Sequence, residues 1–282
     1  MIMRLICALV FAVASGLSGS AWAGAIFLTG HDPDFHASLG GNLTGARNIN
    51  TAAIDFITDS AFNPFSSIAG VKFLFVQSNI SPPSGHTNGL NGIVASGYTA
   101  GTDFEQHNAS DLNAELNLLG TKYNAIVVAS DFGGILTSAE LNILNARSGD
   151  IIDFLNDGGG IYAMAESNSQ GALTTGSTLF GFLPFVVSST QFNQTEVGIV
   201  LTAFGAGLGL VVGDVNGNAS HNIFNDTFGL QVVDFDSQGN ILTIAGRGQV
   251  TGGGVNVPEP ATLALFGLGL VGLGLMRRRR TA

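Results

Sequence analysis

Cysteine, tryptophan and positive charge are scarce in this chain of 282 residues. The one cysteine, Cys7, and the one tryptophan, Trp22, both lie within the first 23 residues, a segment that we expect to be removed. The remaining chain would form no disulfide, bind no zinc through cysteine and use no cysteine nucleophile. With only three tyrosines as well, the composition does not indicate a flat aromatic platform for sugars.

Basic residues are few and unevenly placed. The chain has 10 lysines and arginines against 20 aspartates and glutamates, and four of the ten basic residues are consecutive, at positions 277–280. Residues 24–257 contain 19 acidic and 5 basic residues. Because an acidic surface repels phosphate, this composition excludes nucleic acid as a partner.

The first 23 residues have the three parts of a secretory signal peptide. Arg4 supplies the positive start, residues 5–14 are apolar, and Ala21 and Ala23 flank Trp22 in a small-x-small cleavage pattern. A membrane anchor is the alternative, but the apolar run is too short and no positive residue follows it. The sequence therefore predicts export through the Sec translocon and cleavage by signal peptidase after Ala23.

The other end of the chain carries a second targeting pattern. After a glycine-rich linker at residues 251–256, a Pro-Glu-Pro motif precedes sixteen uncharged residues, 261–276, and then four arginines. Sixteen helical residues span about 24 Å, somewhat less than a hydrocarbon core of about 30 Å. Positive residues stay on the cytoplasmic side, so this helix predicts an inner-membrane precursor whose body faces the periplasm. The residues of the pattern are Pro258, Glu259, Pro260, Arg277, Arg278, Arg279 and Arg280.

This tail, residues 257–282, resembles the PEP-CTERM sorting signal. The resemblance implies a Gram-negative bacterium in which an exosortase recognises and cleaves the tail. It also implies a final location at the cell surface or outside the cell, and an association with exopolysaccharide and biofilm. An uncleaved single-span anchor is the alternative.

The body, residues 24–250, alternates apolar runs with helical patterns. Strands alternating with helices favour a parallel sheet covered on both faces. We expect an α/β domain with a flavodoxin-like, mostly parallel sheet and helices on both faces. The expected strands are residues 25–29, 71–76, 125–129 and 161–165, and the expected helices are 46–57, 111–119 and 137–157, the last starting with a capping box at Thr137 and Glu140.

The second half of the body has a weaker pattern, and we expect it to complete the same sheet. Residues 231–235 and 240–244 flank a polar turn and predict a hairpin. Residues 182–187, 197–203 and 208–212 are also strand-like.

The body resembles, at the level of pattern, the trehalose-utilisation (ThuA-like) proteins and the class I glutamine amidotransferases. The resemblance rests on residues 27–32 with Phe35 and His36, and on the capped helix, glycine stop and strand between residues 136 and 166. In the amidotransferase family a cysteine follows this strand at a sharp elbow. Here the corresponding residues are Met164, Ala165, Glu166 and Ser167, so amidotransferase chemistry is not expected.

Polar residues follow three of the expected strands, at the sheet edge where ligands bind in open α/β folds. Imidazoles and carboxylates there suit a divalent metal or acid–base chemistry. The alternative is a structural role, in which the same side chains cap helices and bind backbone amides. The candidate residues are His31, Asp32, Asp34, His36, Asp131 and Glu166.

A second candidate metal site resembles the first half of a calcium loop. Asp214, Asn216 and Asn218 fall at loop positions one, three and five. The glycine expected at position six is Ala219, and position twelve is Asn225, so a polar turn is the alternative. No other cofactor is indicated.

Two functional hypotheses follow. The first is an exported, non-catalytic binding or structural protein, favoured because the elbow has no cysteine nucleophile. The second is an exported, metal-assisted hydrolase or lyase that uses His31, Asp32, His36 and Glu166.

Overall fold

The computed structural model describes residues 24–78, 90–131, 136–167, 173, 176–192, 197–251 and 254–256. The predicted signal peptide, with Ala21 and Ala23, lies outside these residues. So do the predicted membrane helix at 261–276, the Pro-Glu-Pro motif and the four arginines. Within the described part of the chain, no helix is long and apolar enough to cross a membrane.

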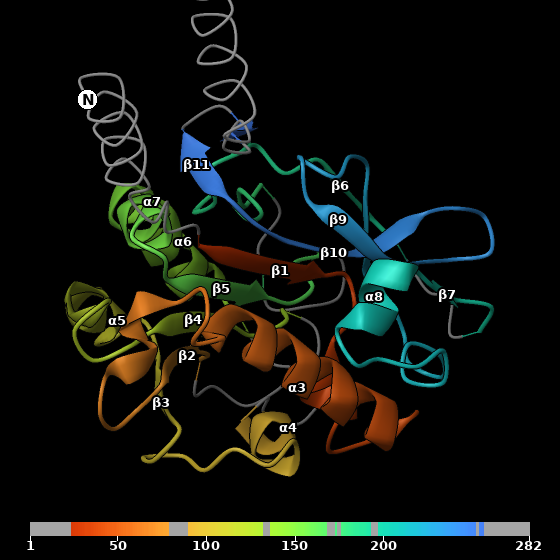
Figure 1. Cartoon of the computed structure of the whole chain (residues 1–282), viewed down its shortest axis with the longest axis horizontal. Helices are drawn as coiled ribbons and strands as arrows, with labels where there is room; N and C mark the ends of the chain where they lie inside the picture. The colour runs from red at the N-terminus through yellow and green to blue at the C-terminus, as the bar shows by residue number, and fades with distance from the viewer. Residues whose placement is uncertain are drawn as a thin grey trace, which may run out of the picture.

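The described body is built on one ten-stranded mixed sheet (Figure 1). One half is parallel, in the order β3-β2-β4-β5-β1. Four of its strands, β1, β2, β4 and β5, consist entirely of buried residues, which explains their uninterrupted apolar sequences. The bounds are Ala25–Thr29 for β1, Phe73–Val76 for β2, Phe104–His107 for β3, Ala125–Val128 for β4 and Gly160–Ala163 for β5.

The other half of the sheet is antiparallel and begins at β10, which pairs with β1 over five residues. β10 in turn pairs with β8 and β9, and β6 and β7 complete the edges. The bounds are Ser189–Gln191 for β6, Val200–Leu201 for β7, Asn222–Phe224 for β8, Gln231–Phe235 for β9 and Ile241–Arg247 for β10. The predicted hairpin at 231–244 corresponds to β9 and β10.

Two features of the predicted sheet were wrong. A flavodoxin-like sheet has the order 2-1-3-4-5, with the first strand between the second and third, whereas here β1 lies between β5 and β10. The sheet is also mixed rather than mostly parallel, since all of its pairings beyond β1 are antiparallel. The cause is β10, a strand from the end of the body that takes the place beside β1.

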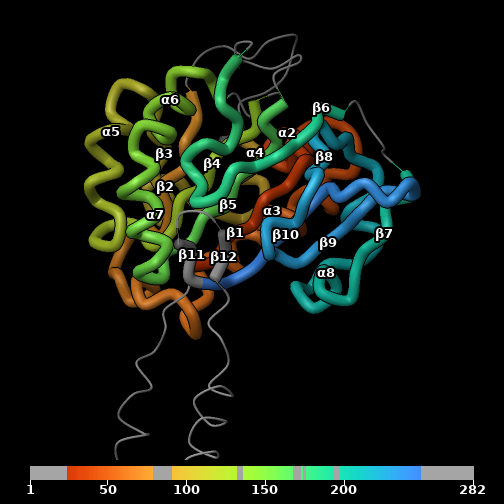
Figure 2. The backbone as a smooth tube through the Cα atoms, turned by 90° about the horizontal axis from the view of Figure 1, so that it is seen from above, coloured from red at the N-terminus to blue at the C-terminus, as the bar shows by residue number. Residues whose placement is uncertain are grey.

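Helices cover both faces of the sheet, as predicted. On one face, α3 (Leu43–Thr58), α4 (Leu90–Ala95) and α8 (Ala203–Gly207) pack on a core that includes Phe27 and Phe75. On the other face, α5 (Leu112–Glu115), α6 (Ser138–Ala146) and α7 (Ser148–Asn156) pack on Leu28 and Val76. Figure 2 shows α5 to α7 on the opposite side of the molecule from α8 and β7.

The predicted helix at 137–157 begins as expected but is interrupted. The Thr137 hydroxyl accepts from the backbone N–H of Ala139, and Glu140 accepts from the backbone N–H of Thr137, which completes the capping box. At Arg147 the backbone leaves helical geometry, with φ −99° and ψ 16°, so that α6 ends and α7 begins.

Several segments differ from the strand predictions. Residues 182–187 and 208–212 form no strand, and of 197–203 only β7 is extended, with α8 starting at Ala203. A short helix, α2 (Pro33–His36), follows β1, and α4 and β3 lie between β2 and β4 in the sequence. At the predicted linker, β11 (Gln249–Thr251) and β12 (Gly254–Asn256) form a two-stranded sheet separate from the main one.

Candidate functional site

The carboxyl ends of β1, β4 and β5 lie side by side and bring the predicted polar residues together. The Asp131 backbone N–H donates to the Ala165 carbonyl at 2.9 Å, and the Ala165 N–H donates to the His31 carbonyl at 3.2 Å. The side chains of His31, Asp32, Asp34, Asp131 and Glu166 are all at most 1% exposed. The cluster is therefore part of the interior.

Asp32 lies between two imidazoles. Its Oδ1 is 3.4 Å from Nε2 of His36 and its Oδ2 is 3.3 Å from Nε2 of His221, which comes from the far half of the chain. Burial alone lowers the pKa of His221, but the Asp32 carboxylate outweighs this effect and the net pKa is raised. Asp32 thus joins the loop after β1 to the segment that leads into β8.

His31 makes a second imidazole–carboxylate pair, with Asp234 of β9. Its Nε2 lies 3.4 Å from Asp234 Oδ2, and its Nδ1 lies 3.2 Å from both the Ala219 carbonyl and the Ser220 hydroxyl. Burial lowers the pKa of His31, but hydrogen bonding and charge from Asp234 raise it above the ordinary value of 6.5. Sequence reasoning did not predict Asp234, because nothing local marks it as a partner of His31.

Asp34 is held by the end of β4. Its two oxygens accept hydrogen bonds from the backbone N–H of Ser130 at 2.9 Å and the Ser130 hydroxyl at 2.8 Å. Burial, followed by repulsion from Asp32, raises the pKa of Asp34 to about 7 despite these hydrogen bonds. The buried site therefore favours the protonated form of Asp34 more than water does.

The elbow residues after β5 are also bound internally. Asp131 accepts from the backbone N–H of Ser167 at 2.9 Å and from its hydroxyl at 3.2 Å. Glu166 Oε2 accepts from the backbone N–H of Phe180, and its Oε1 has no hydrogen-bond partner among the residues that the structure describes. Burial raises the pKa of Glu166 well above its ordinary value, and Asp131 adds to this effect.

The cluster does not have the geometry of a metal centre. In the described part of the chain, the one group of three or more histidine, cysteine or carboxylate side chains with ligand atoms within 4.8 Å of one another is Glu105, His107 and Glu115, on a different edge of the sheet. At the cluster, His36 and His221 both contact Asp32, and His31 contacts Asp234. Such an arrangement joins segments of the chain.

The predicted calcium loop has the geometry of a polar turn. Asp214 Oδ1 and Oδ2 accept from the Asn48 side chain and the Val211 backbone N–H, both at 2.8 Å. Asn216 Oδ1 accepts from the Ile199 N–H, and Asn218 Oδ1 from the Asn42 N–H. These oxygens therefore stabilise loops by hydrogen bonding, which is the alternative that the sequence left open.

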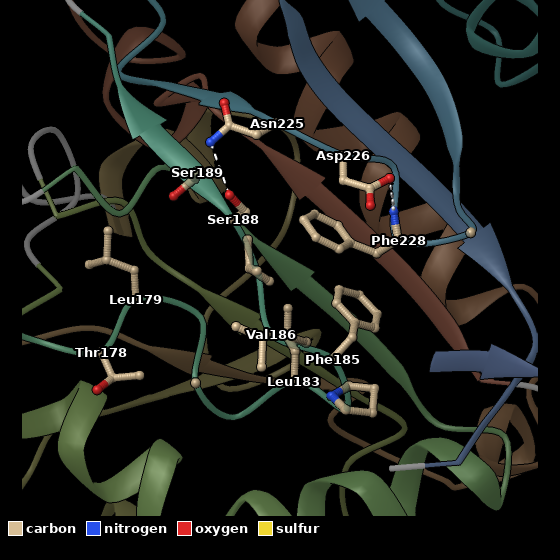
Figure 3. A pocket seen from close by; sticks show the side chains of 14 residues that line it. Thr178, Leu179, Leu183, Phe185, Val186, Ser188, Ser189, Asn225, Asp226 and Phe228 are labelled. Atoms are coloured by element: carbon tan, nitrogen blue, oxygen red, sulfur yellow. Dashed lines mark hydrogen bonds between the residues drawn. The ribbon is translucent and has the colours of Figure 1, made fainter. Parts of the chain in front are cut away.

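A large open groove lies elsewhere, between the segments 178–189 and 225–229 (Figure 3). Its volume is about 1190 Å³. The rings of Phe185 and Phe228 stack on its floor with centroids 5.2 Å apart, and Val186 is 92% exposed. Polar groups line its rim: the Asn225 amide donates to the Ser188 hydroxyl, and Asp226 accepts from the Phe228 N–H. The groove combines apolar faces with hydroxyl, amide and carboxylate groups.

Comparison with known proteins identifies the tail. Residues 256–280 match the PEP-CTERM protein-sorting motif. No curated protein and no solved structure matches the chain, so the resemblance of the body to the ThuA-like proteins gains no support. The motif marks an exported protein that is associated with the membrane before an exosortase processes it.

Proposed function

We propose that this chain is a non-catalytic binding and structural protein of the extracellular polysaccharide matrix. Its precursor is held in the inner membrane with the body in the periplasm, and the exosortase then releases it to the cell surface or beyond. The observation that carries this proposal is the sorting motif at residues 256–280.

A non-catalytic role is supported by the state of the polar cluster. The carboxylates at the sheet edge are buried and are engaged by imidazoles, hydroxyls or backbone amides of the same chain. A general base must come within hydrogen-bonding distance of a substrate proton. Burial of these side chains by their own chain argues against that contact.

The groove between 178–189 and 225–229 is the best-suited surface for a polysaccharide. Sugar rings present apolar C–H faces and a periphery of hydroxyls, which match the groove's apolar side chains and polar rim. Binding sites combine apolar lining with a few oriented polar groups in the same way. The acidic composition of the body favours a neutral or cationic polymer over an anionic one.

The sorting step is tested by Glu259→Gln in the full chain, expressed in cells that carry the exosortase. We expect the variant to accumulate in the membrane fraction with its tail attached, while the wild-type chain loses the tail. Asp153→Asn, which removes one exposed carboxylate of α7, is the matched control and should be processed normally. Normal processing of Glu259→Gln would overturn the exosortase assignment.

The binding step is tested by Val186→Asp. Val186 is 92% exposed, so the substitution changes the groove with little effect on packing. We expect the full chain to co-sediment with exopolysaccharide from the producing cells, and the variant to bind at least tenfold more weakly. Val211→Asp, at a 61% exposed valine outside the groove, should bind normally. Equal binding by both variants would exclude the groove.

The second candidate function is an exported hydrolase or lyase using His31, Asp32, His36 and Glu166. It is favoured by one observation, the raised pKa values of Asp34 and Glu166 at the carboxyl edge of the sheet, since such shifts gather at active sites. Depolymerisation of the exopolysaccharide by the wild-type chain, lost in Glu166→Gln, would establish this function in place of the first.

A further inference from the structure

The edge strand β3 carries an imidazole and a carboxylate on the same face. Residues two apart in a strand point to the same side, so Glu105 and His107 both face α5 while Phe104 packs in the opposite core. Glu115, at the end of α5, approaches them from above the sheet. The hydroxyl of Tyr123, which precedes β4, contacts Oε2 of both Glu105 and Glu115.

The separations between these groups match the coordination sphere of a small divalent cation. His107 Nε2 lies 3.2 Å from Glu105 Oε2 and 3.8 Å from Glu115 Oε2, and the three ligand atoms lie within 4.8 Å of one another. Bonds of 2.0–2.1 Å at tetrahedral angles place ligand atoms roughly 3.3 Å apart. The three side chains are therefore close enough to share one ion once the Tyr123 hydroxyl and the Lys122 ammonium, which contact the same glutamate oxygens, move aside.

His107 is oriented for this role by a fourth residue. Its other ring nitrogen, Nδ1, lies 2.9 Å from Oδ2 of Asp111, at the start of α5. With an ion in the site, the Asp111 carboxylate on Nδ1 would hold the ring proton there and leave the Nε2 lone pair for the ion. Metal-binding histidines are typically fixed by such a partner.

The charge of the group is unbalanced without a cation. Lys122 Nζ lies 2.6 Å from Glu105 Oε2 and 3.1 Å from Glu115 Oε2, and it is the one lysine or arginine that pairs with these carboxylates among the described residues. Three carboxylates, counting Asp111, face this one lysine. Lys122 is 34% exposed on a flexible stem, so its ammonium is free to move into solvent when a divalent cation binds.

We propose that Glu105, His107 and Glu115 form a Zn²⁺ site, with Asp111 as the residue that positions the imidazole and Lys122 as the internal cation that zinc displaces. The mixture of one imidazole and two carboxylates suits zinc and similar transition metals. Calcium takes six to eight oxygen ligands, and magnesium takes oxygens in an octahedron, so both are poor matches. The ion would tie α5 to the edge strand β3.

The test is zinc titration of the full chain, purified in detergent through a streptavidin-binding tag and stripped with a chelator. We expect one Zn²⁺ per chain by calorimetry and, with Co²⁺ in its place, visible absorption bands. His107→Gln should weaken binding at least tenfold, and Asp111→Asn about tenfold to a hundredfold. Lys122→Met should instead tighten binding, because the competing ammonium is gone.

The control variants make the same kinds of substitution, lysine to methionine and histidine to glutamine, at positions outside the proposed site. Lys72→Met removes a lysine that pairs with Asp103, the residue before β3, and His36→Gln removes a histidine that pairs with Asp32. Both variants should bind zinc like the wild type. If His107→Gln does not fold by circular dichroism, the opposite effects of Asp111→Asn and Lys122→Met decide the question. A wild-type chain that binds no stoichiometric Zn²⁺, or equal binding in Asp111→Asn and Lys122→Met, overturns the proposal.

Discussion

The Asp32 carboxylate and the His221 imidazole lie 3.3 Å apart, although they come from the first and last thirds of the chain. Asp32 follows β1 and His221 immediately precedes β8. A backbone hydrogen bond of 2.6 Å from the His221 N–H to the Gly30 carbonyl supports the same contact. The pair therefore helps to fix the antiparallel half of the sheet against the parallel half.

Asp32→Asn should destabilise the chain strongly. Breaking a buried ion pair by removing one partner costs about 3–5 kcal/mol, because the remaining charge stays buried. The measurement is the free energy of unfolding in urea near neutral pH. Asp103→Asn is the matched control: Asp103 pairs with the 54% exposed Lys72, and exposed pairs contribute about 0–1 kcal/mol. Similar small losses in both variants would contradict a structural role for the Asp32 pairs.

The stability of the chain should fall as the pH rises above about 6.5. The pKa values of His31 and His221 are raised in the folded state, so the folded chain binds more protons than the unfolded chain between the two pKa values. Their contribution is complete below the unfolded pKa and is lost as pH rises through the folded pKa. The pKa values of Asp34 and Glu166 are also raised in the folded state, so their contribution to stability likewise falls as the pH rises, beginning at a lower pH. The contribution of Asp34 is lost as the pH rises through its folded pKa of about 7.

This pH dependence is measured by urea unfolding at several pH values between about 6 and 9. In His221→Gln the slope above pH 7 should be smaller than in the wild type, since one titrating group has been removed. The groups that face the two imidazoles are Asp32, Asp131 and Asp234. A wild-type stability that rises over this range would show that the histidines are neutral in the folded chain.

Local sequence patterns predicted much of the parallel half of the sheet. β1, β2, β4 and β5 are short apolar runs, and the capping box at Thr137 marked the start of α6. The order of the strands could not be predicted, because β10 joins β1 through contacts between opposite ends of the body. No local pattern specifies such a pairing.

The polar residues, too, could be grouped in advance only where they are close together in the sequence. His31, Asp32 and Asp34 are close together in the sequence and were recognised as one group, whereas Asp234 comes from β9, near the other end of the body. Glu105 and His107 were missed because β3 was not recognised. Their signal is present in the sequence: two ligand residues at strand spacing, then Asp111 and Glu115 at helical spacing.

Two glycine substitutions should have opposite effects. In Gly30→Ala the new Cβ would lie 2.0 Å from the Asn222 carbonyl oxygen, so the segment after β1 must move away from the start of β8, and we expect a loss of about 3 kcal/mol or more. Gly149 lies within α7 with nothing within 4 Å of the added Cβ. Gly149→Ala should stabilise the chain by about 0.5–1 kcal/mol, because alanine loses less backbone entropy. Thermal melting of both variants beside the wild type measures the difference.

Glu166→Gln should be close to neutral in stability at neutral pH and increasingly favourable above it. Burial raises the pKa of Glu166 well above its ordinary value and so favours the protonated carboxyl group, and glutamine has the same shape without an ionisable proton. Its amide oxygen can accept from the Phe180 N–H in place of Oε2. As pH rises, the wild type must either keep this proton or bury a charge, a cost that the variant avoids.

Unfolding in urea at about pH 7 and about pH 9 measures whether the variant is more or less stable than the wild type at each pH. The control is Glu166→Ala, which leaves the Phe180 N–H without this acceptor and should be destabilised at both pH values. A Glu166→Gln variant that loses several kcal/mol at both pH values would show that Glu166 is ionised and paired in the folded chain.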